Sequence, residues 1–238
     1  SIESSSSATL LNSVISNNTA VAGGGIYNTN SELNIANSNI NNNDALGGGL
    51  YDGGGGIYFD NSSNSILENV IINNNSSARG GAIYCYYSSP VLKTMQIKNN
   101  TSWSGGGIFC HTSSPNLNNI LIINNSASLN FGGGIYCDYN SNPSLENVSL
   151  SNNAAEISGG GVFSFESNPS LVNSIMWNNL PEQIVDYSTS VTTVNHSDIQ
   201  GSWEGVGNID AAPLFTDPDN GDFNLQPSSP CIDAGDPE

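Results

Sequence analysis

Residues 117–136 read LNNILIINNSASLNFGGGIY, and this stretch decides the fold because its pattern recurs along most of the chain. A leucine or isoleucine is followed seven residues later by an asparagine pair and then, after a variable gap, by Gly-Gly-x and a hydrophobic-aromatic couple. The pairs begin at Asn17, Asn42, Asn74, Asn99, Asn124, Asn152 and Asn178. Their spacing of 25, 32, 25, 25, 28 and 26 residues indicates a stacked repeat.

The repeat predicts short strands rather than helices. Its apolar runs are two to five residues long, and glycines and asparagines interrupt them. About three strands fit in one coil, and a coil buries its apolar face only by stacking on others, about 4.8 Å away. We therefore predict an all-β parallel β-helix, a solenoid of about 25 residues per coil, with seven clear coils. Residues 1–181 form the repeats, and residues 182–238 form the last coil or coils and an irregular, acidic closing segment of the same domain.

In-register stacking gives the paired asparagines a structural role. Identical side chains then recur at the strand spacing, and each amide can donate to the carbonyl on one side and accept from the other. Asparagine also tolerates the left-handed backbone of a tight corner. We expect both columns to form ladders, with ligand binding as the lesser alternative. The second column comprises Asn18, Asn43, Asn75, Asn100, Asn125, Asn153 and Asn179.

One interval is longer than the others. Residues 47–59 contain a near duplication of the glycine signature, and its seven extra residues account for the 32-residue spacing. Length variation of this kind is typical of an exposed corner, so we expect a bulge or protruding loop there.

Charge restricts the possible partners. Three basic residues stand against 21 acidic ones, and the net charge of −18 disfavours nucleic acid, anionic membranes and polyanionic glycans. Divalent cations and neutral glycans remain compatible with it. No apolar run approaches the roughly 18 residues of a membrane span, and no signal peptide is recognisable. Few lysines with abundant Asn, Ser and Gly favour an extracellular location, and we expect a mature or trimmed fragment.

An aromatic column follows the glycines. If the preceding isoleucine points inward, strand alternation turns these rings outward, where they could stack on sugar faces. Mutual stacking that stabilises the coil is the alternative, and it is the favoured one. The column comprises Tyr27, Tyr51, Tyr58, Tyr84, Phe109, Tyr136 and Phe163.

Three cysteines form a second column, at Cys85, Cys110 and Cys137. Stacked thiols lie about 5 Å apart, near the lower limit for a disulfide, but in-register side chains point the same way. A buried thiol ladder is therefore favoured over a disulfide or a metal site. Zinc is disfavoured because His111 and His196 are not at ligand spacing with these thiols.

The acidic tail contains a candidate calcium site. Asp217, Asp219 and Asp222 bring three carboxylates together, and hard oxygen ligands suit calcium. Ser228 stands where an EF-hand loop needs its last glutamate. A plain turn is the favoured interpretation, and we expect no other cofactor.

The consensus resembles secreted bacterial right-handed parallel β-helix proteins. Its Gly-Gly-Gly-Ile-Tyr run, together with Ile-x-x-Asn at residues 15–18, 40–43 and 97–100, resembles the paired motifs of polymorphic outer-membrane proteins. The tail is similar to the ends of surface and secreted β-helix proteins, in pieces at residues 197–201, 212–215, 221–225 and 229–237. The resemblance implies a right-handed, pectate-lyase-like fold and a secreted or cell-surface location.

The same fold hosts pectate lyases and polygalacturonases, but the residues do not favour catalysis. Arg79, Lys93 and Lys98 have no acid beside them in sequence, and neither histidine lies in Gly-His-Gly. A carboxylate pair remains open, because Glu68 and Glu146 share a column, two coils apart.

The leading hypothesis is a non-enzymatic extracellular rod that is structural or adhesive and assembles end to end into filaments. Its partners would be its own copies or extracellular glycans. The alternatives are a neutral-glycan-binding surface protein and a polysaccharide lyase or glycosidase.

Overall fold

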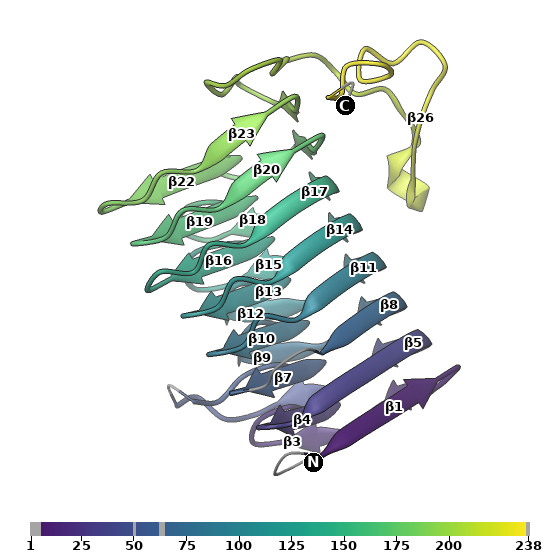
Figure 1. The fold of residues 1–238 in the computed structure, drawn as a ribbon, viewed down its shortest axis with the longest axis vertical. Coiled ribbons are helices and arrows are strands. Elements are labelled where there is room, and N and C mark those ends of the chain that lie inside the picture. Colours follow the sequence, from purple (N-terminus) through teal and green to yellow (C-terminus); the bar gives the residue numbers. More distant parts are fainter. Residues whose placement is uncertain (1–5, 50, 62–64, 237–238) are drawn as a thin grey trace.

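The computed structural model describes residues 6–49, 51–61 and 65–236. The chain winds into a parallel β-helix in which the strands of successive coils lie one above another along the long axis (Figure 1). Three parallel sheets run the length of the stack, and the register pairs equivalent residues of neighbouring repeats. The predicted fold class is confirmed. Apart from a 3-10 turn at Pro218–Asn220, the described residues contain no helix.

The first sheet contains the longest strands, and we call it the long-strand sheet. Its main path is β1 (Ser7–Leu11), β5 (Glu32–Asn41), β8 (Ile66–Asn73), β11 (Val91–Lys98), β14 (Asn116–Ile123), β17 (Ser144–Ser151), β20 (Ser170–Val172) and β23 (Thr193–Asn195). Beside this path lie β2 (Val14–Ser16), β21 (Ile175–Trp177) and β24 (Asp198–Ile199).

The other two sheets complete each coil. The short-strand sheet comprises β3 (Thr19–Ala20), β6 (Asp44–Ala45), β9 (Ser76–Arg79), β12 (Thr101–Ser104), β15 (Ser126–Ala127) and β18 (Ala154–Ala155). The aromatic sheet comprises β4 (Ile26–Thr29), β7 (Ile57–Asp60), β10 (Ile83–Tyr86), β13 (Ile108–His111), β16 (Ile135–Asp138), β19 (Val162–Phe165) and β22 (Ile184–Tyr187). Strands β22, β23 and β24 continue the solenoid beyond residue 181.

Inward-pointing aliphatic side chains fill the interior of the coils. In one coil, Leu117, Ile120 and Ile122 from β14 meet Ile108 from β13, and all four are buried. Each coil supplies only a few such residues, so this core exists only because the coils stack. The cysteine column belongs to it: Cys85, Cys110 and Cys137 are paired in register, buried and free, as the favoured interpretation predicted.

The second asparagine column forms the predicted ladder, from Asn18 to Asn179. The Oδ1 atom of Asn125 accepts hydrogen bonds from the backbone N–H of Asn100 at 3.0 Å and from its Nδ2 at 2.9 Å. The Nδ2 atom of Asn125 in turn donates to Ile97 O at 2.9 Å and to the Oδ1 atom of Asn153 at 3.0 Å. The bonds therefore satisfy buried backbone groups as well as the side chains, which matters because buried unpaired polar groups are costly.

The first asparagine of each pair does not form the ladder that we expected. These residues have φ between 54° and 57°, and most of their side chains are exposed. Each makes the left-handed bend that ends the long-strand segment, a conformation that asparagine tolerates better than most residues. A further column also has positive φ and bends the long strand midway; it comprises Asn12, Asn37, Asn69, Thr94, Asn119, Asn147 and Asn173.

The glycines make the corner before the aromatic sheet. Gly105 has φ of +65°, and a Cβ on Gly106 would lie 2.5 Å from Gly133 O in the next coil. Only a residue without a side chain fits where the coil backbones approach so closely. The extra residues of the long interval form the expected loop between β6 and β7, where Leu46 and Tyr51 are exposed.

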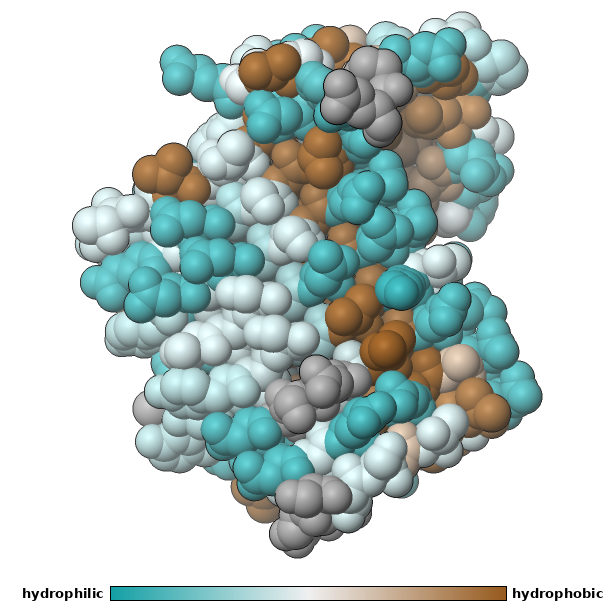
Figure 2. Space-filling view, in the orientation of Figure 1, coloured by the Kyte–Doolittle hydropathy of each residue, from teal (hydrophilic) through white to brown (hydrophobic). Residues whose placement is uncertain are grey.

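The C-terminal segment covers one end of the stack (Figure 1). Trp203 packs against the core and donates from Nε1 to Thr192 O at 3.3 Å. The antiparallel hairpin of β25 (Phe215–Asp217) and β26 (Asp222–Leu225) lies beside the long-strand sheet, above a groove lined partly by Ile71 and Leu121. Figure 2 shows apolar surface along this face.

We predict that Asn125→Ala lowers the free energy of unfolding by about 3 kcal/mol, because it removes four hydrogen bonds and leaves buried groups unpaired. Asn124→Gly is the control, since residue 124 is exposed with φ of 55°, and a change within about 0.5 kcal/mol is expected. Urea unfolding measures both. Equal losses of unfolding free energy in the two variants would contradict the conclusion that the second asparagine column, rather than the first, stabilises the β-helix.

We also predict that iodoacetamide leaves Cys85, Cys110 and Cys137 unmodified in the native chain. Burial excludes the reagent, and it also raises the pKa of Cys85 and of Cys137 well above the usual value, so these thiols stay protonated. After denaturation without a reductant, intact-mass spectrometry should find all four cysteines alkylated. Two protected thiols in the denatured chain would instead indicate a disulfide.

Candidate functional site

The predicted aromatic column points outward from the core, but most of it is covered. Tyr58, Tyr84, Phe109 and Phe163 are buried. Tyr27 and Tyr136 are half-buried, and Tyr51 lies in the inserted loop. The exposed stripe, the less favoured of the two interpretations, is therefore wrong for this column. The rings instead stack on one another, with centroids 4.8 Å apart for Tyr58 and Tyr84 and 4.5 Å apart for Phe109 and Tyr136.

Chain from the inserted loop of the neighbouring coil covers Tyr84. A Cβ on Gly53 would lie 2.6 Å from the Cδ1 atom of Tyr84, so this part of the loop rests directly on the ring. Alternation along the strand sets only the direction in which a ring points. Whether the ring reaches solvent depends on where the loops of its own and neighbouring coils lie.

Other rings, half-buried or exposed, stand at the ends of these strands, at the corners that follow them and, for Tyr51, in the inserted loop. We call this set the aromatic ridge. It comprises Tyr51, Tyr86, Tyr87, His111, Tyr139, Phe165 and Tyr187. Tyr87 and Tyr139 have φ of 47° and 50° at the corner after the strand, and both are exposed. Alternation carried two residues past the buried ring would have found Tyr86, His111 and Phe165.

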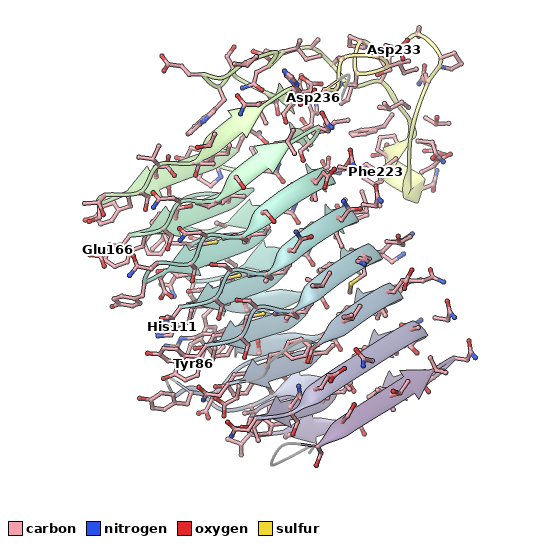
Figure 3. The ribbon with its side chains drawn as sticks, viewed as in Figure 1. Tyr86, His111, Glu166, Phe223, Asp233 and Asp236 are labelled. Carbon is pink, nitrogen blue, oxygen red and sulfur yellow. The ribbon has the colours of Figure 1, made fainter. Side chains whose placement is uncertain are left out.

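The ridge is continuous across several coils. Tyr86 stacks on His111 with a centroid distance of 5.1 Å and an interplanar angle of 10°. Tyr139 meets both His111 and Phe165 edge-on, at 5.1 and 5.6 Å. Figure 3 shows Tyr86 and His111 on adjacent coils at the same edge of the molecule, with Glu166 farther along it. An extended ligand lying along this edge would meet one ring after another.

A groove of about 600 Å³ runs beside the ridge. Its floor is the covered column, at Tyr84, Phe109 and Tyr136. One wall stands before the strands and comprises Arg79, Ser104, Asn130 and Phe131. The other wall stands at the strand ends and comprises Tyr87, His111, Asp138 and Tyr139. A cleft of this volume, mostly aromatic with a few converging polar groups, is typical of ligand sites.

A histidine–aspartate pair forms part of the second wall. The Nδ1 atom of His111 lies 2.8 Å from the Oδ1 atom of Asp138. Burial raises the pKa of Asp138, although the hydrogen bond from His111 and the charge of Arg79 oppose that shift. The Nε2 atom of His111 has no hydrogen-bond partner among the described residues, and the residue lines the groove.

Arg79 is the cation of the opposite wall. Its Nη1 atom donates to Gly49 O at 2.5 Å, which ties the inserted loop to the groove. Within the described chain no carboxylate lies within 4.0 Å of its guanidinium. Burial raises the pKa of Tyr84 and of Tyr136, and the positive charge of Arg79 opposes this, so both phenols are neutral near pH 7.

Two protein-family models match parts of the chain. A model described as a right-handed β-helix region matches residues 1–119. The chain belongs to the right-handed β-helix family. A second model, the repeat of the polymorphic membrane protein of Chlamydia, matches residues 119–138, which carry part of the groove. No curated protein and no solved structure matches the chain.

The repeat match bears on location. Repeats of this kind are associated with outer-membrane and surface proteins, in agreement with the expected surface location. Within the described ranges, no helix has the length and apolar character that a membrane span requires.

The three aspartates of the acidic tail, for which calcium binding was the less favoured interpretation beside a plain turn, do not converge. Asp217 accepts from the Nδ2 atom of Asn220 at 2.8 Å, and Asp222 accepts from the backbone N–H of Asn224 at 3.0 Å. Asp219 is exposed on the 3-10 turn between them. Across the described ranges, no three His, Cys, Asp or Glu residues are placed to hold a metal ion. The carboxylates instead stabilise the hairpin turn.

Glu68 and Glu146, the carboxylate pair left open by the sequence, lie three coils apart rather than the two that we expected, which is too far for glycoside hydrolysis. In the register of the long-strand sheet, Glu68 lies beside Lys93, Lys93 beside Asn118, and Asn118 beside Glu146. These three steps of about 4.8 Å exceed the roughly 10 Å upper limit for such a pair.

We predict that Asp138→Asn stabilises the β-helix at pH 7 by about 1 kcal/mol. Because burial raises the pKa of Asp138, the folded chain holds this proton more tightly than the unfolded chain. The protonated carboxyl of Asp138 therefore stabilises the folded chain in acid. This stabilisation is lost as pH rises through the pKa of Asp138 in the folded state. Asparagine avoids the buried charge and still offers His111 an acceptor.

Urea unfolding at pH 4 and pH 7 measures this difference, and the gain should shrink at the lower pH. Asp219→Asn, at an exposed position, is the control and should change little at either pH. A less stable Asp138→Asn variant at pH 7 would mean that the pair with His111 outweighs burial.

Proposed function

We propose that this β-helix is a non-enzymatic adhesive rod of the cell surface or extracellular space, and that it binds neutral glycan chains along the aromatic ridge and its groove. The observation that carries the proposal is the row of accessible rings on successive coils beside a groove with converging polar groups. Flat apolar faces of sugar rings can stack on such aromatic surfaces, while their hydroxyls need hydrogen-bond partners.

The direction of the ridge favours a chain-like ligand. The rings stand on successive coils, and these coils stack along the long axis of the solenoid (Figure 1), so each further sugar of an extended glycan can reach another coil. Ser104 and Asn130 on one wall, and the Nε2 atom of His111 on the other, offer hydrogen bonds to hydroxyls. Many weak contacts of this kind add up along one ligand, which suits an adhesive surface.

Charge favours neutral ligands. The net charge of −18 repels long polyanions at low and moderate ionic strength. A neutral chain does not experience this field, and burying it against rings requires no counter-charge. The ridge itself is largely uncharged, which agrees with this choice.

The covered end of the rod favours a binding site along its side over end-to-end filament formation. End-to-end assembly would bring the apolar interior of one copy against that of another. At one end of the described solenoid, Trp203 already packs over the core. We therefore assign adhesion to the side of the rod and keep assembly as the second candidate, which electron micrographs of filaments would support.

Binding without cleavage is the simpler use of this groove. Asp138 is its only carboxylate within the described lining residues, and it is bonded to His111. Glycoside cleavage by two carboxylates needs a second group at a suitable distance. Release of reducing ends or unsaturated products from the bound glycan would show that a lyase or glycosidase is the better description.

We predict that the double variant Tyr87→Ala, Tyr139→Ala weakens retention of neutral oligosaccharides at least tenfold, since each exposed ring contributes about 1 kcal/mol of stacking. Affinity electrophoresis in gels containing neutral polysaccharides measures the loss. Phe223→Ala removes a ring from the hairpin, on another side of the molecule (Figure 3), and should retain full binding. No retention of the native chain by any neutral glycan would overturn the proposal.

A further inference from the structure

Arg79 is an unusual residue on this surface. It is one of three basic residues in a chain with 21 acidic ones, yet no carboxylate of the described chain lies within 4.0 Å of it. Lys93 and Lys98 lie on β11 of the long-strand sheet, so Arg79 is the lone basic side chain among the described lining residues of the groove. A guanidinium has five N–H donors, and Gly49 O takes one of them.

The surroundings of Arg79 hold the guanidinium in place without neutralising it. It ends β9, it is half-buried, and its bond to Gly49 O fixes the side chain against the inserted loop. Across the groove, Asp138 is held by His111 at 2.8 Å rather than by Arg79. The positive charge therefore faces aromatic rings and open groove.

We propose that Arg79 forms a subsite for a single carboxylate, so that the groove prefers a largely neutral glycan carrying one acidic sugar. The inference rests on the proposed function and names its ligand class more closely. The planar fork of arginine matches a carboxylate in two parallel hydrogen bonds, which a hydroxyl cannot reproduce. The available Nε2 atom of His111 lies on the opposite wall, where it serves the neighbouring hydroxyls.

The same charges limit the ligand to one acidic group at a time. Asp138 lies on the wall opposite Arg79, and the surface as a whole carries a net charge of −18. A second or third carboxylate along the chain would meet that negative field without a cation to compensate it. A polyuronate is therefore excluded, whereas an isolated uronate gains its pairing with Arg79.

The test uses three ligands with the full chain: xylohexaose, the same oligosaccharide bearing one glucuronate branch, and polygalacturonate. Isothermal titration at low salt should give the single uronate about tenfold higher affinity than xylohexaose, and the polyuronate no measurable binding. The preference should fall as salt is raised, because charge pairing is screened. Cello- and manno-oligosaccharides, each with a counterpart oxidised to one uronate, extend the panel to other neutral backbones.

Arg79→Gln should abolish the preference for the uronate-bearing ligand over its neutral counterpart. Arg79→Lys, which keeps the charge without the fork, should retain only part of it. Lys93→Gln removes the same charge from another sheet and should behave as the native chain. Circular dichroism melting checks that each variant is folded.

The outcomes separate the two proposals. Equal affinity of the native chain for matched neutral and acidic ligands, or a preference that survives Arg79→Gln, overturns the subsite and leaves neutral-glycan binding standing. Binding of the single uronate alone, lost in Arg79→Gln, supports the subsite and overturns the neutral-chain proposal. Binding of neither kind overturns both.

Discussion

The hydrogen bonds between asparagine side chains of successive coils are the constraint on which the other features of this β-helix depend. Each rung joins side chain to side chain and also satisfies backbone groups of the coil before it. A slip by one residue would break these bonds in the interior, where unpaired amides are costly. It would also turn every inward side chain outward, because the side-chain period of a strand is two. The ladder and the apolar core therefore enforce the same register.

The last asparagine of the ladder still finds hydrogen-bond partners, although no further asparagine follows it. After Asn179 the repeat stops, but its Nδ2 atom donates to the Oε1 atom of Gln183 at 2.6 Å. The Nε2 atom of Gln183 then lies 3.2 Å from the Oε1 atom of Gln200. Two longer amides thus complete the network where the coil changes shape. A ladder left open inside the structure would expose donors to an apolar interior.

The sequence predicted those features that depend on the period alone. The parallel stack, the second asparagine column and the buried thiols all follow from placing equivalent residues above one another. The first asparagine of each pair was misassigned, because its recurrence reflects a left-handed bend and not a side-chain bond. Both roles select asparagine, so recurrence alone does not separate them.

The groove was harder to predict because it depends on loops. Strand alternation gave the direction of Tyr84 correctly, but the chain around Gly53 decides that the ring is covered. Arg79 and Asp138 are far apart in sequence and belong to different sheets, and they line the same groove only because the coils that carry β9 and β16 stack with one coil between them. The sequence shows no local motif for such a meeting, and neither residue stood out beyond its charge.

Departures from the repeat distinguish what the fold requires from what it carries. The ladder column holds one kind of side chain in seven coils, because stacking selects identity there. The column at the end of the aromatic sheet holds Thr29, Asp60, Tyr86, His111, Asp138, Phe165 and Tyr187 in register, five kinds of side chain in seven coils. Stabilisation of the stack does not explain that variety. Burial of Asp138 even opposes this stabilisation, because it disfavours the charged carboxylate. A β-helix whose interior is fixed by repetition has its freedom on such outward columns, and that is where its binding specificity is to be sought.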